Sequence, residues 1–168
     1  MRHVMRIAAS VATAAAVGLF AAACDDDDDG DILGPGVRTY QANLFGPNEV
    51  PTPRAEDGIG VATFIDRGDR IDWTLTLDDI TAVTMSHIHG PANPDANASV
   101  IVDLYMPTTP TGEINNQTFS GSFTATNTTQ AVTLAQLRTH LDATRTYVNV
   151  HTSEFPGGAI RGQIIRTR

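Results

Sequence analysis

The chain has 168 residues and a formal net charge of -8, and it contains no lysine. An acidic chain of this kind offers no basic patch to phosphates, so we exclude nucleic acid as a partner. Cys24 is the only cysteine, so no disulfide can form within the chain. Packing, hydrogen bonds or a metal must therefore hold the fold together in an oxidising compartment.

Residues 1–23 have the pattern of a secretory signal peptide. Two arginines precede an apolar run over residues 7–20, and three alanines directly precede Cys24. The run is too short to cross the roughly 30 Å hydrocarbon core of a bilayer as a permanent helix, so we expect export and removal of residues 1–23. The segment resembles the lipobox of bacterial lipoproteins, although Ala21 stands where leucine is usual. This resemblance implies that Cys24 is acylated and anchors the protein in the lipid bilayer; the alternative is an ordinary signal peptide that ends near a free cysteine.

Five consecutive aspartates follow Cys24, and glycine and proline residues continue to residue 36. Because like charges repel and no apolar surface is available for burial, we expect an acidic, flexible tether over residues 24–36. Calcium binding by the aspartates is the alternative, but a calcium loop needs ligands spaced around a turn. The tether would hold the following domain off the membrane, facing the periplasm or the cell exterior.

Residues 37–168 are sufficient for one domain, and their apolar pattern predicts β-structure. The clearest strand is Ile71–Leu77, where apolar and polar residues alternate, so that one face is buried and the other is wet. Similar runs predict about eight strands, over residues 39–45, 61–65, 71–77, 83–89, 100–105, 118–126, 147–151 and 159–165. We predict that the interior includes Ile71, Trp73, Leu75, Leu77, Val148 and Val150.

One short helix is predicted after the sixth strand. Thr133 can cap the segment Leu134–Asp142, whose leucines recur at helical spacing on one face. We expect this helix to pack across one end of the strands. Turn-rich segments between the strands are typical of an antiparallel Greek-key sandwich, so the predicted fold class is all-β with one short helix. Gly157–Gly158 precedes a strand rather than a helix, so a nucleotide is also excluded as a ligand.

Three histidines form the candidate functional site. Alternation in the strand over residues 83–89 places on one face Val83, Met85, His87 and His89. The two imidazoles then lie roughly 6.5 to 7 Å apart along the strand, and His151 completes a three-histidine set if its strand lies nearby. Imidazole nitrogens bind metals at about 2.0 to 2.1 Å and favour copper or zinc over calcium or magnesium. The alternative is that the histidines donate hydrogen bonds to backbone carbonyls or carboxylates and stabilise loop junctions.

The other histidines and the carboxylates show no comparable grouping. His140 falls on the predicted helix and His3 in the signal peptide, so neither is assigned to the site. Glu49, Asp103 and Glu154 lack the spacing of a catalytic acid pair. We interpret these three carboxylates as solvated or loop-fixing groups.

Three stretches of the sequence resemble the CHRD domain, a family named after chordin and also found in bacterial secreted proteins. They are NLFGPNEVP at residues 43–51, HIHG at residues 87–90 and YVNVHTSEFPGGAIRGQ at residues 147–163. The resemblance covers nearly all of the chain beyond residue 36. It implies an extracytoplasmic module without a settled activity, so it indicates the fold and the compartment more than the function.

A looser resemblance is to copper/zinc superoxide dismutase, an eight-stranded Greek-key sandwich. By that resemblance His87, His89 and His151 correspond to copper ligands. Arg161 corresponds to the arginine that attracts the anionic substrate. The bridging histidine, the zinc-binding cluster and the disulfide cysteines of that family have no counterpart in this sequence. A shared fold alone does not carry an activity, so dismutase-like redox activity is only an extension of the metal-binding hypothesis.

Two functions follow from these observations. The first is a membrane-anchored, non-catalytic binding or structural module with an unidentified extracellular or periplasmic ligand, because no nucleophile, acid pair or cofactor loop is evident. The second is a copper or zinc protein that uses the three histidines. Metal analysis of the protein would distinguish between them.

Overall fold

The structure is a computed structural model that describes residues 36–54, 56–124 and 132–168. The predicted signal peptide, Cys24 and the aspartate run lie outside the described residues. Within the described ranges, no helix is long and apolar enough to cross a membrane.

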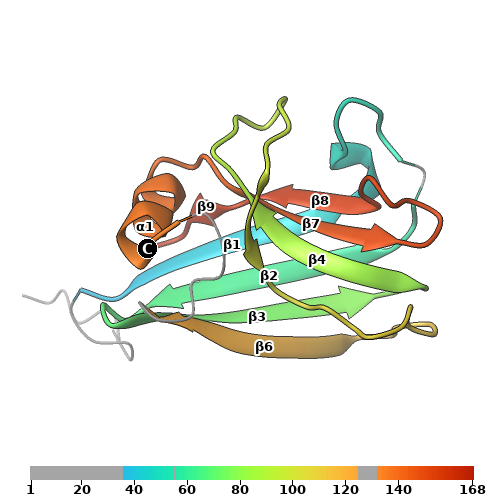
Figure 1. The fold of residues 1–168 in the computed structure, drawn as a ribbon, viewed down its shortest axis with the longest axis horizontal. Helices are drawn as coiled ribbons and strands as arrows, with labels where there is room; N and C mark the ends of the chain where they lie inside the picture. Colours follow the sequence, from blue (N-terminus) through green and yellow to red (C-terminus); the bar gives the residue numbers. More distant parts are fainter. Residues whose placement is uncertain (1–35, 55, 125–131) are drawn as a thin grey trace, which may run out of the picture. The chain divides into compact units, whose positions relative to one another are not determined.

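The described residues form nine strands, one α-helix and a short 3₁₀ helix (Figure 1). The first half of the domain contains β1 (Arg38–Phe45), the 3₁₀ helix Gly46–Asn48, β2 (Ile59–Asp66), β3 (Arg70–Asp78), β4 (Val83–His89) and β5 (Val100–Asp103). The second half contains β6 (Gln117–Thr124), α1 (Leu134–Asp142), β7 (Tyr147–Thr152), β8 (Ile160–Gln163) and β9 (Ile165–Arg166). The predicted all-β fold with one short helix is confirmed. The last predicted strand is divided at Ile164 into β8 and β9.

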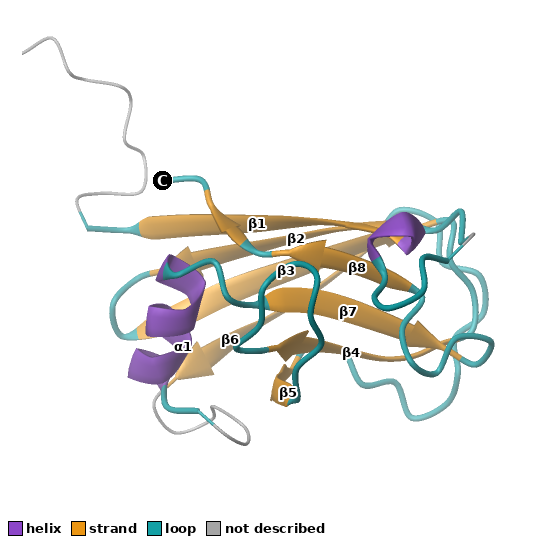
Figure 2. Ribbon diagram, turned by 90° about the horizontal axis from the view of Figure 1, so that it is seen from above, coloured by secondary structure: helices purple, strands orange, loops and turns teal. Residues whose placement is uncertain are grey.

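All strands belong to one antiparallel sheet in the order β5-β4-β7-β8-β1-β2-β3-β6, with β9 beside β1. The sheet curls so that its two halves face each other in a sandwich-like arrangement (Figure 2). A single residue pair, Phe45 with Arg161, connects β1 to β8 at the junction of the halves. The chain crosses between the halves from β3 to β4 and returns from β5 to β6.

The hydrophobic core lies between the two halves of the sheet. The six residues predicted for the interior are all buried, and Trp73 is the most exposed of them at 8%. The three leucines of α1 join the same core, so the helix closes one end of it (Figures 1 and 2). Thr133 and Gln136 form a capping box at the start of the helix, which explains why its bounds match those predicted.

Strict alternation fails at the beginning of β4. The pairing of β4 with β7 shifts register between Val83 and Met85. This β-bulge turns Val83 into the hydrophobic core, where it is fully buried. The prediction that Val83 shares the histidine face is therefore wrong. Beyond the bulge the alternation is regular, with Ile88 in the core and the two histidines on the opposite face.

Most residues on the opposite face of β4, β7 and β8 are buried as well, and loops extend beside these strands (Figure 1). Side chains on this face hydrogen-bond the backbone of Ala98 in one loop and of Pro156 in another. The 3₁₀ helix contributes Asn48, whose side-chain amide donates to the Arg161 carbonyl. We call this the polar layer; its members are Glu49, His87, His89, Tyr147, Asn149, His151 and Arg161. The sheet separates it from the hydrophobic core.

Candidate metal site

The three candidate histidines converge within the polar layer. Their exposed fractions are 6%, 8% and 7% for His87, His89 and His151. One ring nitrogen from each lies within 4.8 Å of the other two. The β4–β7 pairing explains this convergence, because it places Asn149 opposite His87 and places His151 two residue pairs further along, opposite Met85 and on the same face. The structure thus brings together all three residues that the sequence singled out.

Loop carbonyls fix the tautomers of two imidazoles. Nδ1 of His89 donates to the carbonyl of Ala98 at 2.9 Å, and Nδ1 of His151 donates to that of Pro156 at 3.0 Å. A carbonyl oxygen can only accept, so in each ring Nδ1 carries the hydrogen and Nε2 keeps its lone pair. Nε2 of His89 is buried and has no hydrogen-bond partner among the described residues. Both rings therefore present a metal-binding nitrogen.

His87 supplies the third nitrogen. Its Nδ1 lies 3.3 Å from Nε2 of His151. Two nitrogens bound to one tetrahedral ion at about 2.0 to 2.1 Å are about 3.3 to 3.4 Å apart, so this pair already has the required spacing. The other nitrogen, Nε2, lies 3.7 Å from Oδ1 of Asp103. With its hydrogen on Nδ1, His87 donates to Nε2 of His151; with its hydrogen on Nε2, toward Asp103, it offers the Nδ1 lone pair to an ion, and Asp103 then acts as an outer partner of a metal ligand.

Burial keeps the three imidazoles neutral. The loss of hydration lowers the pKa of His87 and of His151, and it lowers the pKa of His89 to about 4. The pKa of about 4 for His89 results from this burial together with smaller lowering effects of the neighbouring imidazoles and the Arg161 guanidinium, against the opposing hydrogen bond to Ala98. At neutral pH the site therefore offers lone pairs rather than positive charge.

Arg161 fixes the loop that covers the histidines. Its side chain is 2% exposed and lies 3.5 Å over the ring of Tyr147. Tyr147 in turn stacks on His89, with 4.9 Å between ring centroids. The guanidinium donates to the covering loop, at Pro94 O, Ala96 O and Asn97 Oδ1. The anion-attracting role that the dismutase resemblance implied for Arg161 stays a prediction.

Sequence reasoning did not predict that Glu49 and Asn149 belong to the polar layer that contains the histidines. Glu49 is 5% exposed, and the Asn149 amide donates to its Oε2 at 3.4 Å. Burial raises the pKa of Glu49 to about 7, although Arg161 acts to lower it. Glu49 Oε1 and Asn149 Oδ1 are buried without a hydrogen-bond partner among the described residues. The position of Asn149 on the histidine face of β7 was an available signal, whereas the loop that carries Glu49 has no periodicity to place it.

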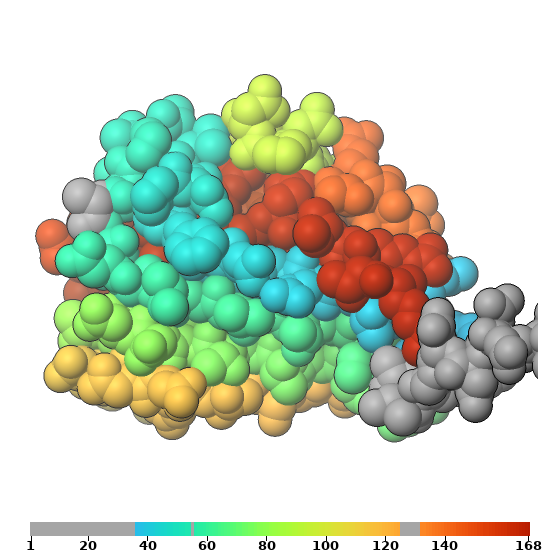
Figure 3. All heavy atoms as spheres, turned by 180° about the vertical axis from the view of Figure 1, so that it is seen from behind, coloured from blue at the N-terminus to red at the C-terminus, as the bar shows by residue number. Residues whose placement is uncertain are grey.

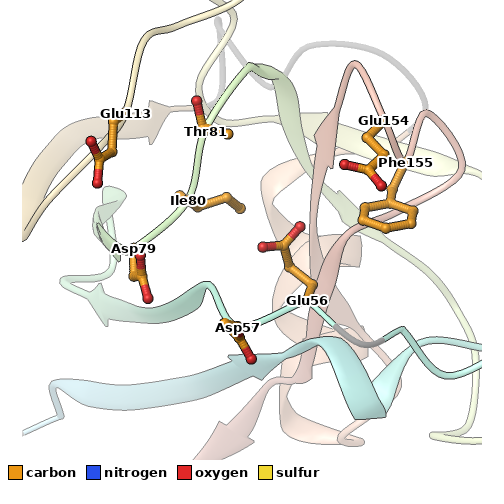
Figure 4. A pocket seen from close by; sticks show the side chains of 8 residues that line it. All are labelled: Glu56, Asp57, Asp79, Ile80, Thr81, Glu113, Glu154 and Phe155. Atoms are coloured by element: carbon orange, nitrogen blue, oxygen red, sulfur yellow. The ribbon is translucent and has the colours of Figure 1, made fainter.

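Glu154 and His140 lie outside the histidine cluster. Glu154 lines an acidic cavity of about 450 Å³ (Figure 4), together with Glu56, Asp57, Asp79, Ile80, Thr81, Glu113 and Phe155. The carboxylates surround this cavity without converging on one point. In the part of the chain that the structure describes, only the three histidines form a group of acidic, histidine or cysteine side chains with metal-binding spacing. His140 belongs to α1, and His3 lies outside the described residues.

The CHRD domain model matches residues 40–164 of the chain. Comparisons with curated proteins and with solved structures find no significant match. The matched range extends from β1 to the end of β8 and includes every member of the polar layer. Because the match spans well over half of the sequence, the chain belongs to the CHRD domain family, a group of binding or structural modules of the extracytoplasmic type.

Proposed function

We propose that this chain is a membrane-anchored extracytoplasmic CHRD module that binds one copper or zinc ion through His87, His89 and His151. The observation that carries the proposal is the convergence of three buried imidazoles, two of whose nitrogens are 3.3 Å apart. Removing a polar atom from water costs free energy unless it finds a partner. Nε2 of His89 finds none among the described residues, and a metal ion would supply one.

A purely structural role explains only part of this arrangement. Bonds from His89 and His151 to loop carbonyls account for one nitrogen of each ring. They do not explain why the remaining nitrogens face a common space. In one tautomer Nδ1 of His87 donates to Nε2 of His151, but that hydrogen bond still leaves Nε2 of His89 without a partner among the described residues. Nitrogen ligands of this kind suit copper and zinc, whereas calcium and magnesium prefer oxygen.

We do not extend the proposal to dismutase chemistry. The histidines are nearly inaccessible beneath the loop that Arg161 holds, and superoxide would need to reach the metal itself. A non-catalytic binding role requires only that the ion enter during slower opening of the loop. The family membership is consistent with such a role.

Calorimetric titration of the full chain with Zn²⁺ and with Cu²⁺ tests the site. One ion should bind per chain. Replacing His87, His89 or His151 by alanine should weaken binding by about 100-fold or more, because even changes outside the ligand set cost about 10- to 100-fold. His140→Ala is the matched control, since it removes an imidazole on α1. No binding by the folded wild-type chain, or equal binding by all variants, would contradict the proposal.

The anchoring half of the proposal rests on the sequence around Cys24. Cys24→Ser removes the sulfur that acylation requires, so the protein should move from the membrane fraction to the soluble fraction. Asp29→Asn leaves that sulfur in place and should stay with the membrane. Fractionation, with mass spectrometry of the N-terminal peptide, measures both outcomes. A wild-type protein that is soluble and carries no acyl mass would exclude the anchor.

A further inference from the structure

Met85 occupies the remaining position on the histidine face of β4. It lies two residues before His87 and beyond the bulge, so both side chains leave the same face. It is also paired directly with His151. Cβ atoms of directly opposite residues in an antiparallel pair lie about 4.5 to 5.5 Å apart. Met85 is half-buried and is not part of the hydrophobic core cluster. Packing in the core therefore does not explain why a methionine occupies this position.

The histidines leave a tetrahedral ion one ligand short. A methionine side chain has three rotatable bonds and a polarizable sulfur, so its thioether can swing toward a neighbour across the strand pair. Asp103 is the nearby alternative on β5, but its carboxylate faces Nε2 of His87, the nitrogen turned away from His151. Its position suits an outer partner of the imidazole rather than a ligand of the ion.

The charge of these ligands distinguishes between the candidate ions. Three imidazoles and a thioether are all neutral, so a bound ion keeps its full charge in a buried space. The hydration energy that an ion loses on burial grows with the square of its charge, and it is therefore about four times larger for a divalent than for a monovalent ion of equal size. A neutral, buried ligand set favours a monovalent ion.

We propose that the site is selective for copper in the Cu(I) state and that the thioether of Met85 is its fourth ligand. Thioethers are soft ligands that select Cu(I), whereas zinc takes thiolate, imidazole or carboxylate ligands. The inference rests on the proposed three-histidine site, for which it names both the ion and a further ligand.

A comparison of two methionine variants tests the inference. Competition with a chromophoric Cu(I) chelator, under reducing conditions without oxygen, measures the Cu(I) affinity of the full chain; calorimetry measures the Zn²⁺ affinity. Every protein carries Cys24→Ser, because a free thiol also binds Cu(I). Met85→Leu, which nearly conserves volume, should weaken Cu(I) binding by about tenfold or more and change Zn²⁺ binding by less than about twofold. Met106→Leu, at a residue that is 51% exposed, should change neither.

X-ray absorption of the copper-loaded chain gives a second measurement that does not depend on a variant folding. In the Cys24→Ser background, the spectrum of the chain that keeps Met85 should contain a sulfur neighbour at about 2.3 Å in addition to imidazole nitrogens, and Met85→Leu should lack it. A spectrum without sulfur, unchanged Cu(I) affinity in Met85→Leu, or tighter binding of Zn²⁺ than of Cu(I) would overturn the inference while leaving the three-histidine site intact. Binding of neither ion would refute the proposed function itself.

Discussion

At the scale of single residues, Glu49 shows how burial changes the chemistry of a carboxylate. Its raised pKa of about 7 means that the folded chain holds a proton on Glu49 more tightly than the unfolded chain does. The resulting stability is present below the unfolded pKa of about 4.5 and is lost as pH rises through about 7. The lowered pKa of the histidines acts in the opposite direction, since stability is lost as pH falls below about 6.5.

Glu49→Gln should separate these two effects. Glutamine does not ionise, so the variant does not lose this stability as pH rises. As pH increases from about 4.5 to about 8, the free energy of unfolding of the metal-free variant should rise by on the order of 2 to 3 kcal/mol relative to that of the metal-free wild type. The histidine contribution is common to both proteins and cancels in the difference. Chemical denaturation across this pH range measures it. If the difference between the two proteins does not change with pH, burial does not control the ionisation of Glu49.

The histidine face could be predicted from local sequence, whereas the full polar layer could not. His87 and His89 share a face because they lie two residues apart in one strand, and this holds for any regular strand. The approach of His151 depends on the pairing of β4 with β7, which periodicity does not reveal. Asp103 reaches His87 only because β5 pairs on the other side of β4. Glu49 belongs to a loop whose path is set by tertiary contacts.

At the scale of elements, β6 depends on a glycine that accommodates an aromatic ring. Gly121 is paired with Trp73 of β3, and a Cβ at this position would lie 2.7 Å from Cζ2 of the indole. Trp73 also stacks on Phe123, with 6.2 Å between ring centroids. The glycine therefore allows the indole to lie across the edge of the sheet, as an aromatic residue beside an edge glycine can.

Gly121→Ala should lower the free energy of unfolding by about 1 to 3 kcal/mol, because the indole must leave its position or the strands must separate. Ser120→Ala, at an exposed position of the same strand, should have an effect within about 0.5 kcal/mol. Urea denaturation followed by the fluorescence of the single tryptophan measures both. Equal stabilities of the two variants would show that the ring is not confined by Gly121.

The elements differ in how far their sequence determines them. The alternation of β3 and the capping box of α1 are local, and both elements lie where the pattern indicated. The bulge in β4 and the division between β8 and β9 arise from pairing with neighbouring strands. Such interruptions leave the apolar pattern nearly unchanged, so the prediction assigned continuous strands to both regions.

At the scale of the whole domain, the described parts of residues 36–168 contain two buried regions of different character. The hydrophobic core between the halves of the sheet stabilises the fold. The polar layer lies on the outer face of β4, β7 and β8. Its histidines hydrogen-bond the Ala98 and Pro156 carbonyls and so attach two loops to the strands. A metal held by the same histidines would connect both loops and two strands through one centre, so metal binding and loop closure should occur together.

The central claim is that the three histidines hold a metal ion, and elemental analysis of the full chain tests it most directly. The wild-type chain and a variant with His87, His89 and His151 all replaced by alanine are incubated with Cu and Zn, desalted and analysed. Both proteins keep the five aspartates that follow Cys24, so nonspecific binding there is matched. We predict one tightly held ion per wild-type chain and only background in the variant. No retained metal in the folded wild-type chain, or equal metal in the two proteins, would contradict the claim.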